Sequence, residues 1–231
     1  MSNEQKMLED LPEILPTFGD PVRIVELGVN DGYHTRAIID WLDGLHRRFI
    51  YVGLEPDPRI HPILPTTVNF VRAAIASEDK MMALHLSEGV SDDGAIYSGS
   101  SSLHPPGELI HQYWPKMKFL KTTQVMGITY DTLCAHHGLD EVDFVWCDTQ
   151  GCEVDAIKGG SQFFPKTKWF FTEYADARIY SGQATFKELC AMLPDWEVYT
   201  DYGGDALLRN KHYDHPLRVL ERQKCGAPKG T

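Results

Sequence analysis

VRIVELG (residues 22–28) is a run of β-branched and apolar residues that ends at a glycine, a pattern that predicts a short buried strand. In the next segment, HTRAIIDWLDGLHR (34–47), apolar residues recur at helical spacing and form one face. RFIYVGLEP (48–56) is a second apolar run and it stops at a proline. Strand, helix and strand in this order predict a βαβ unit with parallel strands.

The same alternation continues along the chain. Further strands are predicted at residues 67–75, 81–87, 122–128, 142–148 and 168–174, and helices at 129–138, 153–164 and 186–194. Residues 196–202 and 205–210 predict an antiparallel pair joined by two glycines. The expected fold class is therefore α/β, with a doubly wound, mostly parallel Rossmann-like sheet and an antiparallel C-terminal strand pair.

The domain organisation follows from these elements. Residues 1–21 predict an N-terminal extension whose short helix is broken at Pro12 and Pro16, residues 22–210 form the main domain, and residues 211–231 a flexible tail. Residues 88–121 are rich in glycine, serine and aromatic residues. A long irregular segment inside a compact domain predicts a substrate-binding loop or lid.

Composition restricts the partners of this chain. The 231 residues carry a net charge of −11, which disfavours binding to nucleic acid or to an anionic membrane surface. The sequence has no apolar run long enough to span a membrane, and the N-terminus lacks the pattern of a signal peptide. Five cysteines without a CxxC motif predict reduced thiols and a cytoplasmic location.

Ligands of doubly wound sheets bind beyond the carboxyl ends of the strands, so the residues after the strands are the site candidates. The first predicted strand is followed by a turn that contains two glycines four positions apart. Glu55 follows the second strand, 23 residues after the second of these glycines, a distance that suits a carboxylate bound to ribose hydroxyls. The candidates of this turn are Glu26, Gly28, Asn30, Asp31 and Gly32.

The turn favours a cationic nucleoside over a dinucleotide. It lacks the GxGxxG pattern, and the carboxylates of Glu26 and Asp31 would repel a pyrophosphate. A nucleoside with a sulfonium and an amino group suits these charges better, which points to S-adenosylmethionine.

The motifs VELGVNDG and VGLEP resemble the first two motifs of class I S-adenosylmethionine-dependent methyltransferases. ITYDTLCAHHGLDEVDFVWCDTQGCEVDAIKGG (128–160) is similar to the hallmark block of the FkbM-type family. The resemblance covers about residues 22–210, with two departures: Trp146 stands where the family has lysine, and Thr149-Gln150 stand where it has a Val-Glu pair. The matching residues are Asp131, Leu133, Asp143, Phe144, Asp148, Gly151, Glu153 and Gly159.

This resemblance implies methyl transfer from S-adenosylmethionine to a hydroxyl of a sugar or another small natural product. Asp148, at the end of a strand, is the first candidate for a proton acceptor or cofactor contact, although an N-cap role is the alternative. Glu173 and His104 are further catalytic candidates. Ala74 and Ser102 are predicted to line the cofactor site.

Three alternatives remain at this point. A magnesium site at Asp148, Glu173 and Asp176 is conceivable from their oxygen ligands but is not favoured, and no metal ligand is assigned. A nucleotide-dependent oxidoreductase of the NAD type would share the sheet. A catalytically silent binding module would explain the missing lysine at Trp146.

Overall fold

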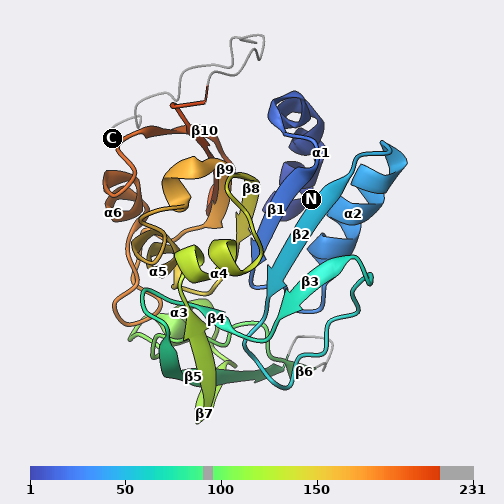
Figure 1. Cartoon of the computed structure of the whole chain (residues 1–231). Helices are drawn as coiled ribbons and strands as arrows, with labels where there is room; N and C mark the ends of the chain where they lie inside the picture. The colour runs from blue at the N-terminus through green and yellow to red at the C-terminus, as the bar shows by residue number, and fades with distance from the viewer. Residues whose placement is uncertain (91–95, 214–231) are drawn as a thin grey trace.

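The computed structural model describes residues 1–90 and 96–213 and contains a seven-stranded main sheet in the order β10-β11-β9-β8-β1-β2-β3 (Figure 1). β11 is antiparallel to both of its neighbours, and every other pair in this sheet is parallel. The predicted fold class is therefore confirmed, including the antiparallel C-terminal pair. The strands are β1 (Val22–Leu27), β2 (Phe49–Leu54), β3 (Val68–Val71), β8 (Val142–Cys147), β9 (Thr167–Glu173), β10 (Trp196–Asp201) and β11 (Asp205–Asn210).

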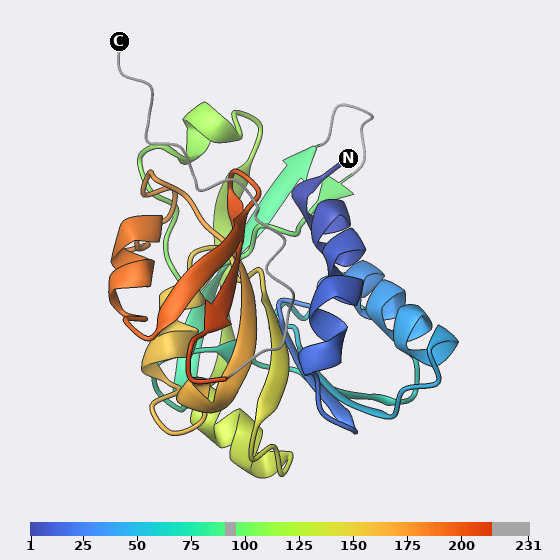
Figure 2. The same cartoon turned by 90° about the horizontal axis from the view of Figure 1, so that it is seen from above.

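Helices cover both faces of the main sheet (Figure 2). α1 (Asn3–Ile14) and α2 (Tyr33–Gly44) pack on one face, where Ile24 and Phe144 are buried. On the other face, Val25 and Val145 pack with α4 (Tyr130–His136), α5 (Glu153–Lys158) and α6 (Phe186–Ala191). Successive strand residues point to opposite faces, so near-continuous apolar strands supply two cores.

A second, four-stranded sheet has the order β4-β7-β5-β6 and comprises β4 (Ala74–Ile75), β5 (Lys80–Val90), β6 (Ile96–Tyr97) and β7 (Lys118–Ile128). The single strand predicted at 67–75 is therefore wrong, since Arg72 and Ala73 separate β3 from β4 in another sheet. The segment 88–121 is also less irregular than predicted, because it holds β6, α3 (Ile110–Tyr113) and the ends of β5 and β7. Residues 91–95 of that segment lie outside the described part.

The N-terminal helix continues past the predicted break. α1 runs to Ile14 with Pro12 inside it, and the following 3-10 turn, Leu15–Thr17, contains Pro16. Pro12 lies in the last turn, where only one backbone hydrogen bond is lost, and Met7, Leu11 and Ile14 are at most 1 % exposed in the α2-side core. Burial of this apolar face outweighs the proline penalty. A second 3-10 turn spans Phe164–Lys166.

The topology brings three loops together. β1 lies between β8 and β2, and Leu27 is in register with both Cys147 and Leu54. The loops that follow these three residues therefore share one edge of the main sheet, on the side of the small second sheet (Figure 1). None of the helices in the described residues has the length and apolar character needed to cross a membrane. The predicted tail, residues 211–231, lies outside the described residues beyond Tyr213.

Candidate active site

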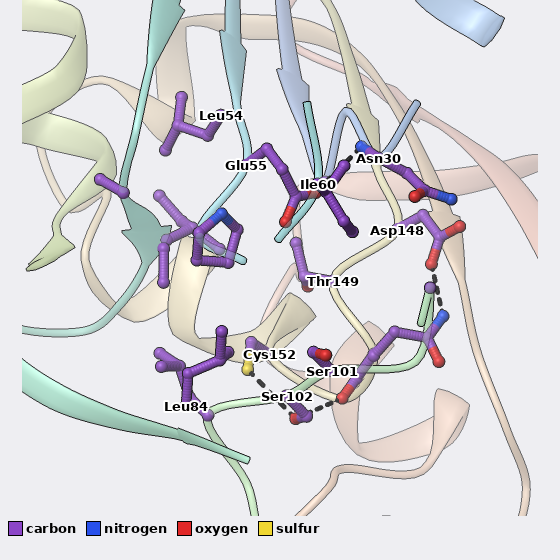
Figure 3. A pocket seen from close by; sticks show the side chains of 18 of the residues that line it. Asn30, Leu54, Glu55, Ile60, Leu84, Ser101, Ser102, Asp148, Thr149 and Cys152 are labelled. Carbon is purple, nitrogen blue, oxygen red and sulfur yellow. Dashed lines mark hydrogen bonds between the residues drawn. The ribbon is translucent and has the colours of Figure 1, made fainter. Parts of the chain in front are cut away.

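A cavity of about 640 Å³ opens between the loops after β1, β2 and β8 and the edge of the second sheet (Figure 3). Six of the predicted site residues line it: Gly28, Asn30, Glu55, Ala74, Ser102 and Asp148. The structure thus brings together residues from five separate segments, while their individual roles stay predictions.

The loop after β1 approaches β8 so closely that only glycine fits at its start. Gly28 has φ +91°, and a Cβ there would lie 1.9 Å from the backbone oxygen of Asp148. The backbone N–H groups of Gly28 and Val29 donate to the oxygen of Leu54 at 3.0 and 2.9 Å. Asn30 also has a left-handed φ of +49°. This backbone forms a thin cavity wall that a ligand can approach closely.

The carboxyl group of Glu55 is fixed by main-chain donors. Its Oε2 accepts from the N–H of Asn30 at 2.9 Å, and its Oε1 accepts from the N–H of Asp57 at 2.8 Å. Burial raises the pKa of Glu55, while these two backbone donors oppose the rise. Each carboxylate oxygen has a second lone pair, so the group can still accept hydrogen bonds from a diol.

Sequence reasoning missed Asp57, Arg59 and Ser101. The Asp57 side chain is fully buried and pairs with Arg59 at 2.6 Å. Ser101 donates to the same Asp57 oxygen at 2.7 Å and lines the cavity, so this pair ties the β2 loop to residues 98–103. The closeness of Asp57 and Arg59 to Glu55 in the sequence was the available signal. Ser101 was weighed beside Ser102 as a contact of the cofactor carboxylate, but only Ser102 was assigned to the site.

Part of the cavity wall is apolar and forms a slot beside Glu55, whereas Ser98, Thr149 and Gln150 add polar groups elsewhere in the lining. Figure 3 shows Ile60 near Glu55, with Leu84 and Cys152 across the cavity. Such a slot suits a flat apolar ring, because burial of apolar surface drives its binding. The apolar residues of the slot are Leu54, Pro56, Ile60, Ala73, Ala74, Ile75, Leu84 and Leu103.

Two carboxyl groups lie close together beside Gln150: Asp148 lines the cavity, and Glu173 lines a neighbouring cleft. Asp148 follows β8 and Glu173 ends β9, its parallel neighbour. The side-chain nitrogen of Gln150 lies 2.7 Å from Asp148 Oδ1 and 2.9 Å from Glu173 Oε2. Burial, then the charge of Asp148, holds the pKa of Glu173 well above its usual range. Two carboxyl groups in different environments are a common arrangement for acid–base chemistry.

A second cleft of about 890 Å³ lies beside this pair, and Gln150 lines both spaces. Glu173 and Tyr180 form part of its wall, together with Trp114 from the segment 88–121. This segment therefore contributes to a cleft, whereas its roles as a substrate-binding loop and as a lid both stay predictions. The remaining lining residues are Tyr113, Tyr174, Ala175, Asp176, Ile179, Gln183, Gly203 and Gly204.

Three residues of the predicted cofactor turn do not line the cavity. Glu26 is fully buried beneath it and accepts hydrogen bonds from Thr35 and Tyr51. Burial raises the pKa of Glu26 to about 7. Asp31 is exposed and accepts from the N–H of Tyr33, and Gly32 is the N-cap of α2.

His104 is paired away from the reacting end. Its Nε2 lies 2.9 Å from Asp155 Oδ2, and this hydrogen bond raises the pKa of His104 to about 10. The ring is therefore protonated at neutral pH, which argues against the predicted role of proton acceptor. Donor atoms of His104, Cys152 and Asp155 lie within 4.8 Å of one another, but this sulfur- and nitrogen-containing set does not suit Mg²⁺.

Trp146, which stands where the family has lysine, does not line the cavity. Trp146 is fully buried on the α1–α2 face, stacked on His34 at 4.6 Å and packed against Phe171. In β8 it is in register with Glu26 of β1. The substitution therefore changes the core behind the site and leaves the lining intact, which removes the one observation that favoured a silent binding module.

Comparison with known proteins agrees with this geometry. Residues 26–203 match the model of the family described as methyltransferase FkbM domain. Over 204 residues the chain is 30% identical to 2-O-methyltransferase NoeI of Sinorhizobium fredii (strain NBRC 101917 / NGR234), covering 83% of this chain and 80% of that protein. The family implies S-adenosylmethionine as methyl donor, and the apolar slot beside Glu55 with the close backbone at Gly28 fits its nucleoside. The chain thus belongs to the FkbM methyltransferase family and is an O-methyltransferase.

Proposed function

We propose that this protein methylates a hydroxyl group of a sugar or a similar polyhydroxylated small molecule. One observation carries the proposal. Asp148 lines the first cavity, Glu173 lines the second cleft, and Gln150 between them lines both. When bound, S-adenosylmethionine supplies an electrophilic methyl group on a positively charged sulfur. The chain has to hold both ligands in line and accept the proton of the hydroxyl.

The cofactor-binding residues follow from the cavity lining. Glu55 is proposed to accept hydrogen bonds from the ribose hydroxyls, because its position is fixed by Asn30 and Asp57. Ile60, Ala74 and Leu84 are proposed to contact the adenine. Gly28 provides the thin backbone wall next to Asp148. The predicted contact of Ser102 is supported by its place in the lining and by its bond to the Gln150 oxygen at 2.7 Å.

Asp148 is the proposed proton acceptor of the reaction. Burial and the charge of Asp148 hold the pKa of Glu173 well above its usual range, which favours the protonated form that can donate a hydrogen bond. His104 is protonated and bound to Asp155. Of the three predicted catalytic residues, Asp148 is the one that lines the cavity.

The second cleft is the proposed acceptor site. Trp114 and Tyr113 offer aromatic faces, and Asp176 and Gln183 offer polar groups that suit hydroxyl recognition. The relative from Sinorhizobium fredii is a 2-O-methyltransferase by name, which is consistent with a hydroxyl acceptor. An oxidoreductase of the NAD type has no comparable support, since the turn at Gly28 lacks the pyrophosphate pattern.

The proposal is tested in two steps. Calorimetry should detect S-adenosylmethionine binding to the purified chain, and absence of binding at millimolar concentration would refute the proposal. Methyl transfer from isotope-labelled S-adenosylmethionine is then measured on a panel of mono- and oligosaccharides and on simple amines. If amines are labelled and no hydroxyl compound is, the proposed hydroxyl acceptor is wrong and the reaction is N-methylation.

A further inference from the structure

Gln150 occupies the boundary between the two cavities. It lines both the cavity proposed for the cofactor and the second cleft. Its backbone is left-handed, with φ +56°, and Gly151 follows with φ +99°. These two residues turn the chain sharply between β8 and α5. Glu153 secures the turn, because its Oε1 accepts from the N–H of Gly151 and the hydroxyl of Thr149, both at 3.1 Å.

The side-chain amide of Gln150 uses both of its ends. The nitrogen has two N–H groups, and the oxygens of Asp148 and Glu173 lie 2.7 and 2.9 Å from it, one for each. On the other side, the Tyr180 hydroxyl lies 3.0 Å from the amide oxygen. The flipped amide would place its oxygen against two carboxyl groups, so these neighbours fix its orientation.

The neighbourhood of Gln150 is rich in acidic groups. Asp148 and Glu173 touch its amide, and Glu153 on α5 and Asp205 on β11 also act on Glu173. Among the described residues, no lysine, arginine or histidine forms an ion pair with Asp148 or Glu173. A neutral donor at position 150 therefore holds two carboxyl groups side by side without adding a charge that either ligand would have to counter.

We infer that Gln150 is the positioning residue of the methyl transfer: its amide holds the Asp148 and Glu173 carboxyl groups in one geometry where the cofactor cavity opens into the acceptor cleft. This inference rests on the proposed function and names a residue that acts through Asp148. Its main-chain oxygen also accepts from Ser102, so the same residue couples the cavity wall to the carboxyl pair.

The decisive variant is Gln150→Glu, with Gln162→Glu as a matched control on the exposed turn after α5. A carboxyl group at position 150 would face Asp148 and Glu173, so we expect it to keep its proton at neutral pH. Potentiometric difference titration against the wild type should show about one additional bound proton near pH 7. The control carboxyl should titrate near its ordinary value of about 4.3 and add none.

Two further measurements separate positioning from simple loss of structure. Gln150→Leu removes both donors, and misplacement of the reacting groups should lower kcat by about 10- to 100-fold on the hydroxyl acceptor found by the labelling panel. The Kd of S-adenosylmethionine should stay within about threefold, because Glu55 and the apolar slot are unchanged. Gln150→Glu, with its carboxyl protonated at neutral pH, keeps one donor and should therefore lose less kcat than Gln150→Leu.

The outcomes distinguish this inference from the proposed function. If the new carboxyl titrates like that of the control, Gln150 does not face the two carboxyl groups and the inference fails, whatever the cofactor result. If Gln150→Leu retains wild-type kcat, the positioning role fails although the contact exists. Failure of the wild type to bind S-adenosylmethionine overturns the proposed function and leaves the titration result valid.

Discussion

The two ends of the active-site cavity fix their carboxyl groups in different ways. At the cofactor end, Glu55 is held by backbone N–H groups of Asn30 and Asp57. At the reacting end, the side chain of Gln150 bridges Asp148 and Glu173, and a side-chain hydrogen bond with Asp148 also contributes to the raised pKa of Glu173. Main-chain donors are present whatever the residue type, whereas a side-chain donor is lost by a single substitution. The position of the Glu55 carboxyl group therefore tolerates most substitutions of the residues that hold it. At the reacting end, by contrast, one substitution at position 150 can change the positions of both carboxyl groups.

The largest effect is expected at the reacting end. Asp148→Asn removes the proposed proton acceptor and keeps the size of the side chain, so turnover should fall by about 10²- to 10⁴-fold. Steady-state methyl transfer to the acceptor found by the labelling panel measures it. Asp140→Asn, on the exposed surface after α4, is the control and should retain turnover. Turnover of Asp148→Asn within threefold of the wild type would remove Asp148 from this role.

The backbone at the cofactor end should be the next most sensitive. Gly28→Ala places a Cβ 1.9 Å from the Asp148 oxygen at φ +91°, so the loop must move away from β8. The strain should cost at least about 2 kcal/mol, seen as lower thermal stability or as at least about 30-fold weaker S-adenosylmethionine binding. In Gly44→Ala, the added Cβ meets nothing within 4 Å and should change neither. If Gly28→Ala and Gly44→Ala have the same thermal stability and the same affinity for S-adenosylmethionine, the backbone at Gly28 is not the close cavity wall proposed above.

A smaller effect is expected from the carboxyl group that the backbone holds. Glu55→Gln keeps the shape but replaces one acceptor oxygen by an amide, which opposes the N–H groups of Asn30 or Asp57. Loss of one charge-assisted hydrogen bond predicts roughly tenfold weaker S-adenosylmethionine binding, measured by calorimetry. Glu108→Gln, on the exposed surface, should bind as the wild type does. An unchanged affinity in Glu55→Gln would place the ribose elsewhere.

The sequence pointed to Glu55 but not to Gln150, and the reason is local. Glu55 was predicted from its distance to Gly32 because strand, helix and strand are consecutive in the chain. Gln150 was noted only as a departure from the family. Its role depends on a left-handed backbone and on Glu173, 23 residues later at the end of the next strand, which no periodicity reveals.

Two other features show where sequence patterns fail. β5 and β7 form much of the second sheet, but polar and charged residues occupy much of their exposed surface, so the sequence does not mark their full length. Glu26 and Trp146 are in register on neighbouring strands and face the helix α2 side, although Glu26 was predicted for the cofactor site. A one-residue difference along a strand decides which face a side chain takes.

The smallest predicted effect concerns the ion pair between His104 and Asp155, which holds part of the cavity wall in place. His104 follows the cavity segment 98–103, and its contact with Asp155 ties that segment to α5. Asp155→Asn removes the charge partner and should lower the free energy of unfolding by about 1–2 kcal/mol at pH 6, since both groups are only partly buried. Urea unfolding of both proteins measures the difference.

The pH dependence of this difference follows from the pKa of His104. The folded value is raised to about 10, whereas an unfolded histidine titrates near 6.5. A raised folded pKa means that the stabilisation is fully present below about pH 6.5 and is lost as the pH rises toward 10. The gap between wild type and Asp155→Asn should therefore be widest at pH 6 and shrink through pH 8 to pH 9.5. A gap that stays constant over this range would show that His104 is neutral in the folded protein and would reopen its role as a proton acceptor.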